Sequence, residues 1–202
     1  TGYHSLLCEA SARSARAHVL SAPSCVYRPP GAPQRQWGVF LPLYALRTAT
    51  DWGAGSYADL ARLAEWTTHE GGSLVGTLPL LPSFHGAGGE ASPYLPVTRL
   101  LWSEFFADIE SAPNLAECTE ALQLLQSRQV VQAREALRRS TLVDYAGVWE
   151  LKSALLAALA RHAWSGESQL RDRLEAFLRT HGLVRDYAAF RGAAERQARP
   201  WR

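Results

Sequence analysis

Residues 37–56 read WGVFLPLYALRTATDWGAGS, and this stretch decides the fold. Its first half is nearly all apolar and lacks the alternation of a strand that has one face in water. Strands that are covered on both faces, as in a parallel sheet, have this pattern. Pro42 has no N–H to donate, so it argues against a long uninterrupted ladder there. We predict a buried strand within residues 36–46 and a loop over residues 47–55.

A helix and a second strand follow this loop. Ser56 is a good N-cap, and Asp59 completes a carboxylate version of the capping box. Apolar residues then recur at helical spacing until Gly71 and Gly72 end the helix. Residues 73–81 are a second apolar run. The order strand, loop, helix, strand predicts one βαβ unit, the connection that a parallel pair of strands requires.

The flanking regions differ in character. Residues 3–8 and 18–20 read as short strands of a small β element, and a Pro/Gly-rich linker follows them. Beyond Pro113, helical spacing predicts four helices, with Gly182 closing the third; they cover residues 115–139, 145–164, 168–180 and 186–196.

Composition excludes several classes of partner. The 202 residues carry a net charge of +2 with scattered basic residues, which predicts no nucleic-acid partner. No apolar run approaches the roughly 20 residues needed to cross a membrane. Cys8, Cys25 and Cys118 are far apart, which favours reduced thiols and a cytoplasmic location over a disulfide framework. The absence of methionine, even at position 1, suggests a piece of something longer.

Common catalytic and cofactor motifs are also missing. The six histidines form no metal-ligand spacing, so we predict no metal site. Residues 86–89 are glycine-rich without the spacing of a phosphate loop, and residues 53–55 lack the third glycine of a dinucleotide loop. We therefore predict no cofactor. No GxSxG motif supports a serine hydrolase.

Glycoside chemistry needs paired carboxylates, which lie about 5–5.5 Å apart in a retaining enzyme. The candidates are Asp51, Glu90, Glu104 and Asp108, and only the first two lie in loops after predicted strands. The alternative for Asp51 is an Asx turn that orders its loop, and for Glu90 a solvated charge. We predict a catalytic role for none of them.

Aromatic residues are the better signal. Tyr94 and Trp52 lie in polar, turn-rich loops at the edge of the sheet where α/β folds bind ligands. There a ring can stack on a sugar, and the alternative for both is core packing. For Tyr44 and Trp102 we favour core packing.

Five segments resemble a known family. Residues 37–47 and 51–60 are similar to the WGxxxxLYSLRS…DWGIGDFxDL pattern of bacterial 4-α-glucanotransferases. Residues 92–100 (SPYLPVTRL) resemble the SPYxPSSRL segment of that family. LVDYAGVWELK and DYAAFR, at 142–152 and 186–191, resemble two segments of the family's helical region, LVDYxxVxxLK and DYAxFRAL. The resemblance covers nearly the whole chain, in order and at similar spacing.

The resemblance implies an α/β fold, the beginning of an elaborated (β/α)8 TIM-type barrel. It divides the chain into the end of an N-terminal β domain and linker (1–33), the first βαβ unit (34–112) and a helical inserted subdomain (113–202). The implied reaction is a retaining transfer of α-1,4-glucan segments between maltooligosaccharides. The aspartate nucleophile, the glutamate acid/base and a second aspartate are expected beyond Arg202, so we expect this chain by itself to catalyse nothing.

The resemblance also implies where substrate binds. Tyr94 would stack on the sugar next to the cleavage point, with Ser92 and Pro93 holding its loop, and we add Trp52 and Asp51 to the substrate-binding set. Departures from the family pattern bear on the acceptor-side contacts; they are Ser56, Leu78, Ser103, Glu104 and Phe106. Two alternatives remain: a non-catalytic glucan-binding protein, or a helical protein-interaction module formed by residues 115–196. The resemblance carries no expectation of oligomeric state.

Overall fold

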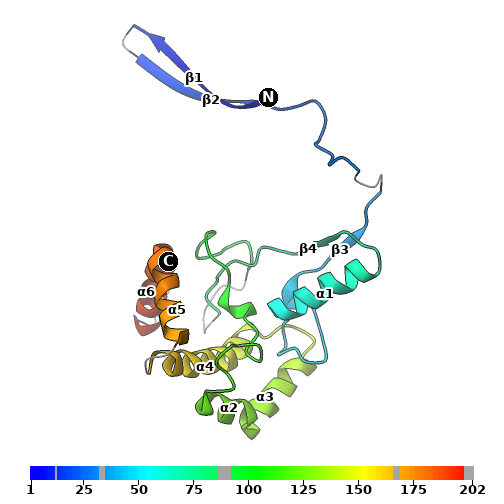
Figure 1. The fold of residues 1–202 in the computed structure, drawn as a ribbon, viewed down its shortest axis with the longest axis vertical. Helices are drawn as coiled ribbons and strands as arrows, with labels where there is room; N and C mark the ends of the chain where they lie inside the picture. Colours follow the sequence, from blue (N-terminus) through cyan, green and yellow to red (C-terminus); the bar gives the residue numbers. More distant parts are fainter. Residues whose placement is uncertain (12, 32–34, 86–91, 166–168, 198–202) are drawn as a thin grey trace. The chain divides into compact units, whose positions relative to one another are not determined.

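The computed structural model describes residues 1–11, 13–31, 35–85, 92–165 and 169–197. The chain divides into two compact units, Thr1–Gln36 and Trp37–Arg202 (Figure 1).

The first unit is a β-hairpin. Strand β1 (Gly2–Ala10) pairs antiparallel with β2 (Arg13–Ser21), in a register that runs from Gly2 opposite Ser21 to Ala10 opposite Arg13. This confirms the predicted β element, although both strands are longer than the apolar stretches that indicated them. The hairpin buries none of its described side chains, and its large apolar residues, Tyr3 among them, face solvent.

The second unit begins with the predicted βαβ arrangement. Strand β3 (Gly38–Phe40) lies parallel to β4 (Leu74–Gly76), and helix α1 (Tyr57–His69) connects them. The close approach of the strands requires glycine at position 38, because a Cβ there would lie 2.0 Å from the carbonyl oxygen of Leu74. Mixed α/β architecture is therefore confirmed.

The strand pair differs from the prediction in length and burial. β3 ends before Pro42, and the chain turns into the short 3₁₀ helix η1 (Leu43–Ala45), as the missing proline N–H would favour. Phe40 and Leu74 are exposed, so the described residues do not cover both faces of this pair. The apolar sequence predicted strands covered on both faces, and in the described residues these two strands are less buried than that.

The helical region follows the predicted pattern with two corrections. The first expected helix is split into α2 (Thr119–Gln126) and α3 (Arg128–Arg139), because the Ser127 hydroxyl accepts the backbone N–H of Val130 and caps α3. Gly182 does not close a helix; it is the first residue of α6 (Gly182–Gln197). Helices α4 (Tyr145–Trp164) and α5 (Gln169–Thr180) lie where the spacing indicated.

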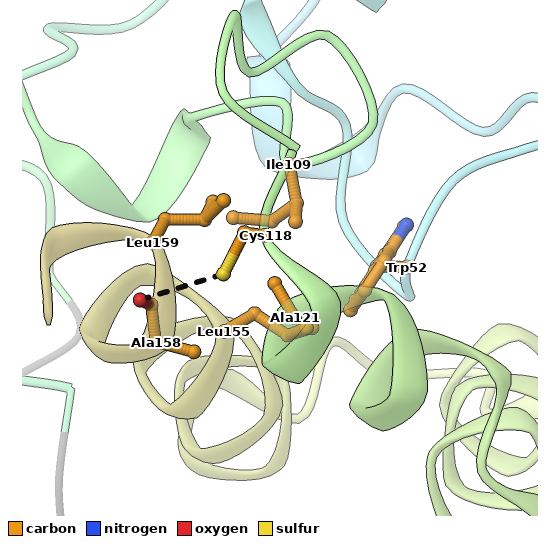
Figure 2. Packing of buried hydrophobic residues seen from close by; sticks show 7 residues of the cluster. All are labelled: Trp52, Ile109, Cys118, Ala121, Leu155, Ala158 and Leu159. Atoms are coloured by element: carbon orange, nitrogen blue, oxygen red, sulfur yellow. Dashed lines mark hydrogen bonds between the residues drawn. The ribbon is translucent and has the colours of Figure 1, made fainter. Parts of the chain in front are cut away.

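Two apolar clusters form the core. In one, Trp52 and Ile109 pack with side chains of α2 and α4, and Figure 2 shows Ala121 and Leu155 among them. The other joins Leu43 and Leu80 to Val148 of α4 and to the short helix η2 (Glu104–Phe106). The core prediction for Trp102 is wrong: its side chain is 70% exposed.

Candidate functional site

Two loops leave the same edge of the β3–β4 pair, because the strands are parallel. The β3 loop, residues 41–56, leads into α1, and the β4 loop, residues 77–103, leads into η2. Every substrate-binding residue expected from the sequence lies in one of them. The two loops place these residues very differently.

The β4 loop is fastened near both of its ends. The backbone N–H of Ser103 donates to Leu80 O at 2.9 Å, and that of Val97 donates to Pro82 O at 2.8 Å. Residues 86–91, and with them the carboxylate candidate Glu90, lie outside the described residues.

The Ser92-Pro93-Tyr94 segment forms a turn in this loop. The Ser92 hydroxyl accepts the N–H of Tyr94 at 3.3 Å, and the Ser92 carbonyl accepts the N–H of Leu95 at 3.2 Å. Pro93 lines a small cavity of about 20 Å³ together with Ser83 and His85. The Tyr94 side chain is 66% exposed, so a large part of it is accessible to a ligand.

A buried histidine lies at the base of the β4 loop. The His85 ring packs 4.3 Å from the ring of Phe105 and stacks at 5.8 Å on Tyr145, measured between centroids. Among the described residues, neither of its ring nitrogens has a hydrogen-bond partner. Burial, together with the nearby charge of Arg191, lowers the pKa of His85 to about 4. The imidazole is therefore neutral at neutral pH.

Arg191 of α6 reaches the same place and was not assigned a role from the sequence. Its guanidinium lies over the Phe84 ring at 4.5 Å, and Nη1 donates to Ser83 O at 2.9 Å. Nη2 forms an ion pair with Glu104 at 2.9 Å. The only signal in the sequence was its position in the family-like segment DYAAFR.

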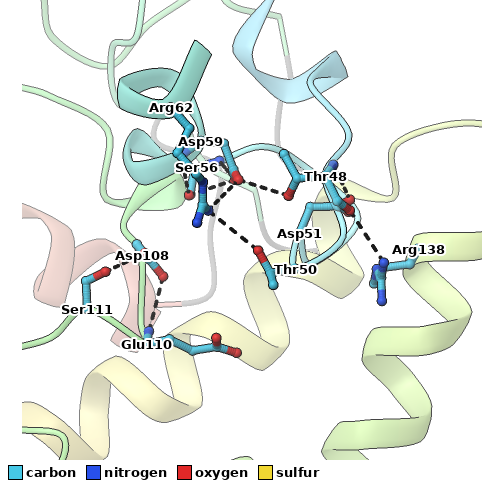
Figure 3. Close-up of polar contacts among 10 residues, drawn as sticks. All are labelled: Thr48, Thr50, Asp51, Ser56, Asp59, Arg62, Asp108, Glu110, Ser111 and Arg138. Carbon is cyan, nitrogen blue, oxygen red and sulfur yellow. Dashed lines mark hydrogen bonds and ion pairs between the residues drawn. The ribbon is translucent and has the colours of Figure 1, made fainter. Parts of the chain in front are cut away.

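The β3 loop is ordered by two buried carboxylates (Figure 3). Asp51 accepts the backbone N–H groups of Thr48, at 2.9 Å, and Gly53, at 2.8 Å, and pairs with Arg47 at 3.4 Å. These bonds match the loop-ordering alternative for Asp51. They occupy both of its carboxylate oxygens.

Asp59 forms the predicted capping box at the start of α1. Its carboxylate accepts the N–H and the hydroxyl of Ser56, each at 2.8 Å, while the Ser56 hydroxyl accepts the N–H of Asp59. Burial by itself raises the pKa of Asp59, but hydrogen bonds from Ser56, Arg62 and Thr48 outweigh it and the pKa lies below its ordinary value. The family departure at Ser56 thus keeps the helix cap.

Trp52 does not face solvent. Its side chain is 5% exposed and belongs to the core cluster of Figure 2, and the guanidinium of Arg134 lies 5.4 Å from the ring centroid. The sugar-stacking role expected for Trp52 is at odds with this burial, because stacking needs an open ring face. Core packing, the alternative considered from the sequence, fits the structure.

A polar pocket of about 180 Å³ lies between the β3 loop and the segment after η2. Asp51, Asp108 and Lys152 are among its lining residues. Asp108 is engaged locally, accepting the N–H of Glu110 and the hydroxyl of Ser111. Lys152 donates to Phe105 O at 2.8 Å and Ala107 O at 3.0 Å.

The buried ammonium of Lys152 holds the end of η2 against α4 through these two bonds. Burial lowers its pKa to about 8, against the opposing charges of Asp108 and Asp59.

Among the described residues, no three metal-ligating side chains gather as a metal site would need, and no helix has both the length and the apolar character of a membrane span.

Comparison with known proteins decides the family. The model of the family described as 4-alpha-glucanotransferase matches residues 41–202. The chain belongs to the 4-α-glucanotransferase family. This confirms the resemblance found in the five sequence segments, and it does not favour the helical interaction module.

Individual relatives agree with the family model. The chain is similar to the 4-alpha-glucanotransferase of Haemophilus influenzae, with 32% identity over 160 residues, which are 78% of this chain and 23% of that protein. It is similar to the 4-alpha-glucanotransferase of Mycobacterium tuberculosis, with 30% identity over 209 residues, covering 99% of this chain and 28% of that one. The chain thus spans about a quarter of the length of these curated relatives.

The fold also has a solved counterpart. The crystal structure of amylomaltase from Corynebacterium glutamicum superposes with a TM-score of 0.63 at 23% sequence identity, over 90% of this chain and 26% of that one. At 23% identity this likeness shows a shared fold.

Three of the departures from the family pattern have structural roles in this chain. The Ser103 hydroxyl accepts the N–H of Phe105 and caps η2, and its carbonyl accepts the Tyr57 hydroxyl at 2.9 Å. Glu104 pairs with Arg191. Phe106 is buried with its ring edge against Tyr57. These residues join the β4 loop to α1 and α6.

Proposed function

We propose that this chain supplies one sugar-binding surface of a 4-α-glucanotransferase that transfers α-1,4-glucan segments between maltooligosaccharides by a retaining double displacement. Its β3–β4 pair is then the beginning of a (β/α)8 barrel, with residues 1–33 as the end of a β domain and residues 113–202 as a helical insertion. The nucleophile, the acid/base and the stabilising aspartate come from outside residues 1–202. A cytoplasmic location, expected from the cysteines, is part of the same proposal.

The observation that carries the proposal is the exposed Tyr94 in a turn ordered by Ser92. An aromatic residue that is 66% exposed, in a loop at the ligand-binding edge of an α/β sheet, can stack on a pyranose. Pro93, within this turn, lines one cavity together with Ser83 and His85 and so places the turn beside the outgoing arm of the loop. Asp51 contributes by ordering the neighbouring loop, and Trp52 by its place in the core.

Calorimetric titration of the protein with maltoheptaose tests this role by measuring the binding affinity. Tyr94→Ala removes the stacking face and is expected to weaken binding by about tenfold or more, whereas Tyr94→Phe keeps the ring and most of the affinity. Unfolding by urea serves as the control, because loss of an exposed ring leaves stability unchanged to within about 0.5 kcal/mol. Equal affinity of wild type and Tyr94→Ala would refute the assignment.

Incubation with maltotriose tests where the catalysis resides. We expect the 202-residue chain to release no glucose and to form no longer chains, because its buried aspartates are engaged in ordering loops. A protein with the family's complete length is expected to form both products. Turnover by residues 1–202 would show that this chain carries catalytic carboxylates.

A further inference from the structure

One side chain from a distant part of the chain, Arg191, contacts residues at both ends of the β4 loop. Arg191 lies in α6 and is 7% exposed, and its guanidinium contacts the outgoing arm of the loop and the first residue of η2. On the outgoing arm it donates to Ser83 O and lies over Phe84. At the start of η2, directly after the returning arm ends at Ser103, it pairs with Glu104. A single rigid group therefore bridges the two ends of the segment that contains Tyr94.

The geometry of this bridge requires an arginine. Two separate nitrogens of the guanidinium are used, Nη1 for Ser83 O and Nη2 for Glu104, while its flat face lies over the ring of Phe84. A lysine offers one small charged group and no flat face, so it cannot reproduce all three contacts. Burial makes the fork more specific still, because a buried charge must keep its partners.

The contact extends from the ends of the loop to the sugar-facing turn. Ser83 and His85 share a cavity with Pro93, the residue before Tyr94. Val97, three residues beyond Tyr94, is hydrogen-bonded to Pro82, the residue before Ser83. Ser83 therefore lies beside both the cavity that Pro93 lines and the residue that holds Val97.

We propose that Arg191 is a positioning residue for glucan binding: by contacting residues at both ends of the β4 loop, it sets where the Tyr94 ring is presented. This inference rests on the proposed role of Tyr94 and adds that helix α6, far along the chain, controls the affinity of that site. Glu104, a departure from the family pattern, is the partner that completes the bridge.

Two variants weaken the bridge in different ways. Arg191→Lys retains the charge and loses the fork, and Glu104→Gln retains Arg191 and removes the ion pair. The matched control is Arg161→Gln, which breaks an exposed Arg–Glu pair between α4 and α2. Hydrogen exchange of the Leu95 and Val97 amides reports the order of the turn, with the Leu122 amide of α2 as an internal reference.

In both bridge variants we expect exchange at Leu95 and Val97 to accelerate about tenfold while Leu122 stays unchanged. Maltoheptaose binding should weaken by about tenfold, since a displaced stacking face loses its contact. Arg161→Gln should alter neither quantity. Unchanged exchange at Leu95 and Val97 in both variants would overturn the proposal, and equal acceleration throughout the chain would replace it with a role in stability only.

The exchange and binding measurements separate this inference from the proposed function. Exchange tests the bridge without any sugar, and Tyr94→Ala tests the sugar site with the bridge intact. If Tyr94→Ala leaves maltoheptaose binding unchanged, the sugar site fails whatever the exchange shows. If Tyr94→Ala weakens binding and the bridge variants leave it at the wild-type level, the positioning role of Arg191 fails and the sugar site stands.

Discussion

The β3 loop and the β4 loop begin at the same edge of one strand pair, and each carries an aromatic residue expected to meet sugar. In the β3 loop Trp52 is 5% exposed, and in the β4 loop Tyr94 is 66% exposed. The difference comes from what packs on each loop. Helices α2 and α4 pack against Trp52, whereas the described contacts of the β4 loop lie mainly at its two arms.

This contrast teaches that position at the sheet edge is a necessary but insufficient sign of a binding residue. A loop over which helices pack becomes part of the core, and its polar groups then turn inward, as Asp51 and Asp59 do. A loop held at its arms can keep a side chain accessible at its turn. The same residue types therefore stabilise the fold in one loop and are free to meet a ligand in the other.

The largest effect is expected when a tryptophan is removed from each of these two loops in turn. Trp52→Ala should lower the free energy of unfolding by about 3–5 kcal/mol, because it leaves a cavity in the core. Trp102→Ala, in the β4 loop, should change it by no more than about 0.5 kcal/mol, since that side chain is exposed. Urea unfolding followed by circular dichroism measures both. Similar losses in the two variants would remove the distinction between the loops.

As the pH falls, the free energy of unfolding should first reflect protonation of His85 in the β4 loop, and only at lower pH protonation of Asp59 beside the β3 loop. The pKa of His85 is about 4 in the folded chain against 6.5 for the free side chain, because burial disfavours its charged form. Between these pH values the unfolded chain binds a proton that the folded chain does not. The free energy of unfolding should therefore fall as pH drops from 6.5 towards 4, by about 2–3 kcal/mol at most.

Urea midpoints across this pH range measure the effect. His85→Phe should flatten the pH dependence, while His69→Gln, at an exposed position on α1, should leave it unchanged. Asp59, with a lowered pKa, loses its contribution only below its ordinary value of 3.8, so the β3 loop should persist through the range. A pH dependence that survives in His85→Phe would contradict this order.

A smaller effect is expected from Gly53, where the β3 loop touches α3. Its φ is +92°, and a Cβ there would lie 2.8 Å from the Cβ of Leu137. Gly71 has a φ of +83° with open space around it, so Gly71→Ala measures backbone strain alone. Gly53→Ala should cost about 1–3 kcal/mol more than Gly71→Ala, because it adds a steric clash. Equal costs, measured by urea unfolding, would mean that α3 yields to the added methyl group.

Local patterns predicted much of the fold. The capping box at Ser56 and Asp59, the parallel order of the strands and the length of α4 all follow from residues close in sequence, and the structure has each of them. The missed boundaries have local causes too. Ser127 interrupts an otherwise continuous helical pattern with a cap, and Gly182 has the open space and helical backbone of a first-turn residue rather than a helix end.

The candidate site could be predicted only in part. The sequence located the Ser92–Tyr94 turn and assigned its residues, and that role stays a prediction. It could not rank Trp52 against Tyr94, because local composition is the same for a loop that helices cover and one that they leave open. It also gave no role to His85 or Arg191. The hydrogen bond from Arg191 to Ser83 O spans 108 residues, and the ring that stacks on His85 belongs to Tyr145 of α4, so only folding brings these partners together.

The family resemblance, the βαβ unit and the proposal that residues 92–94 face sugar could all be reached from the sequence, because each depends on residues that are neighbours along the chain. The tertiary structure decided which aromatic is accessible, which carboxylates are engaged in loops, and that α6 holds the β4 loop through Arg191. Those properties depend on burial and on contacts between distant segments. Burial and long-range contact are set by how helices pack on the sheet edge, which no local pattern encodes.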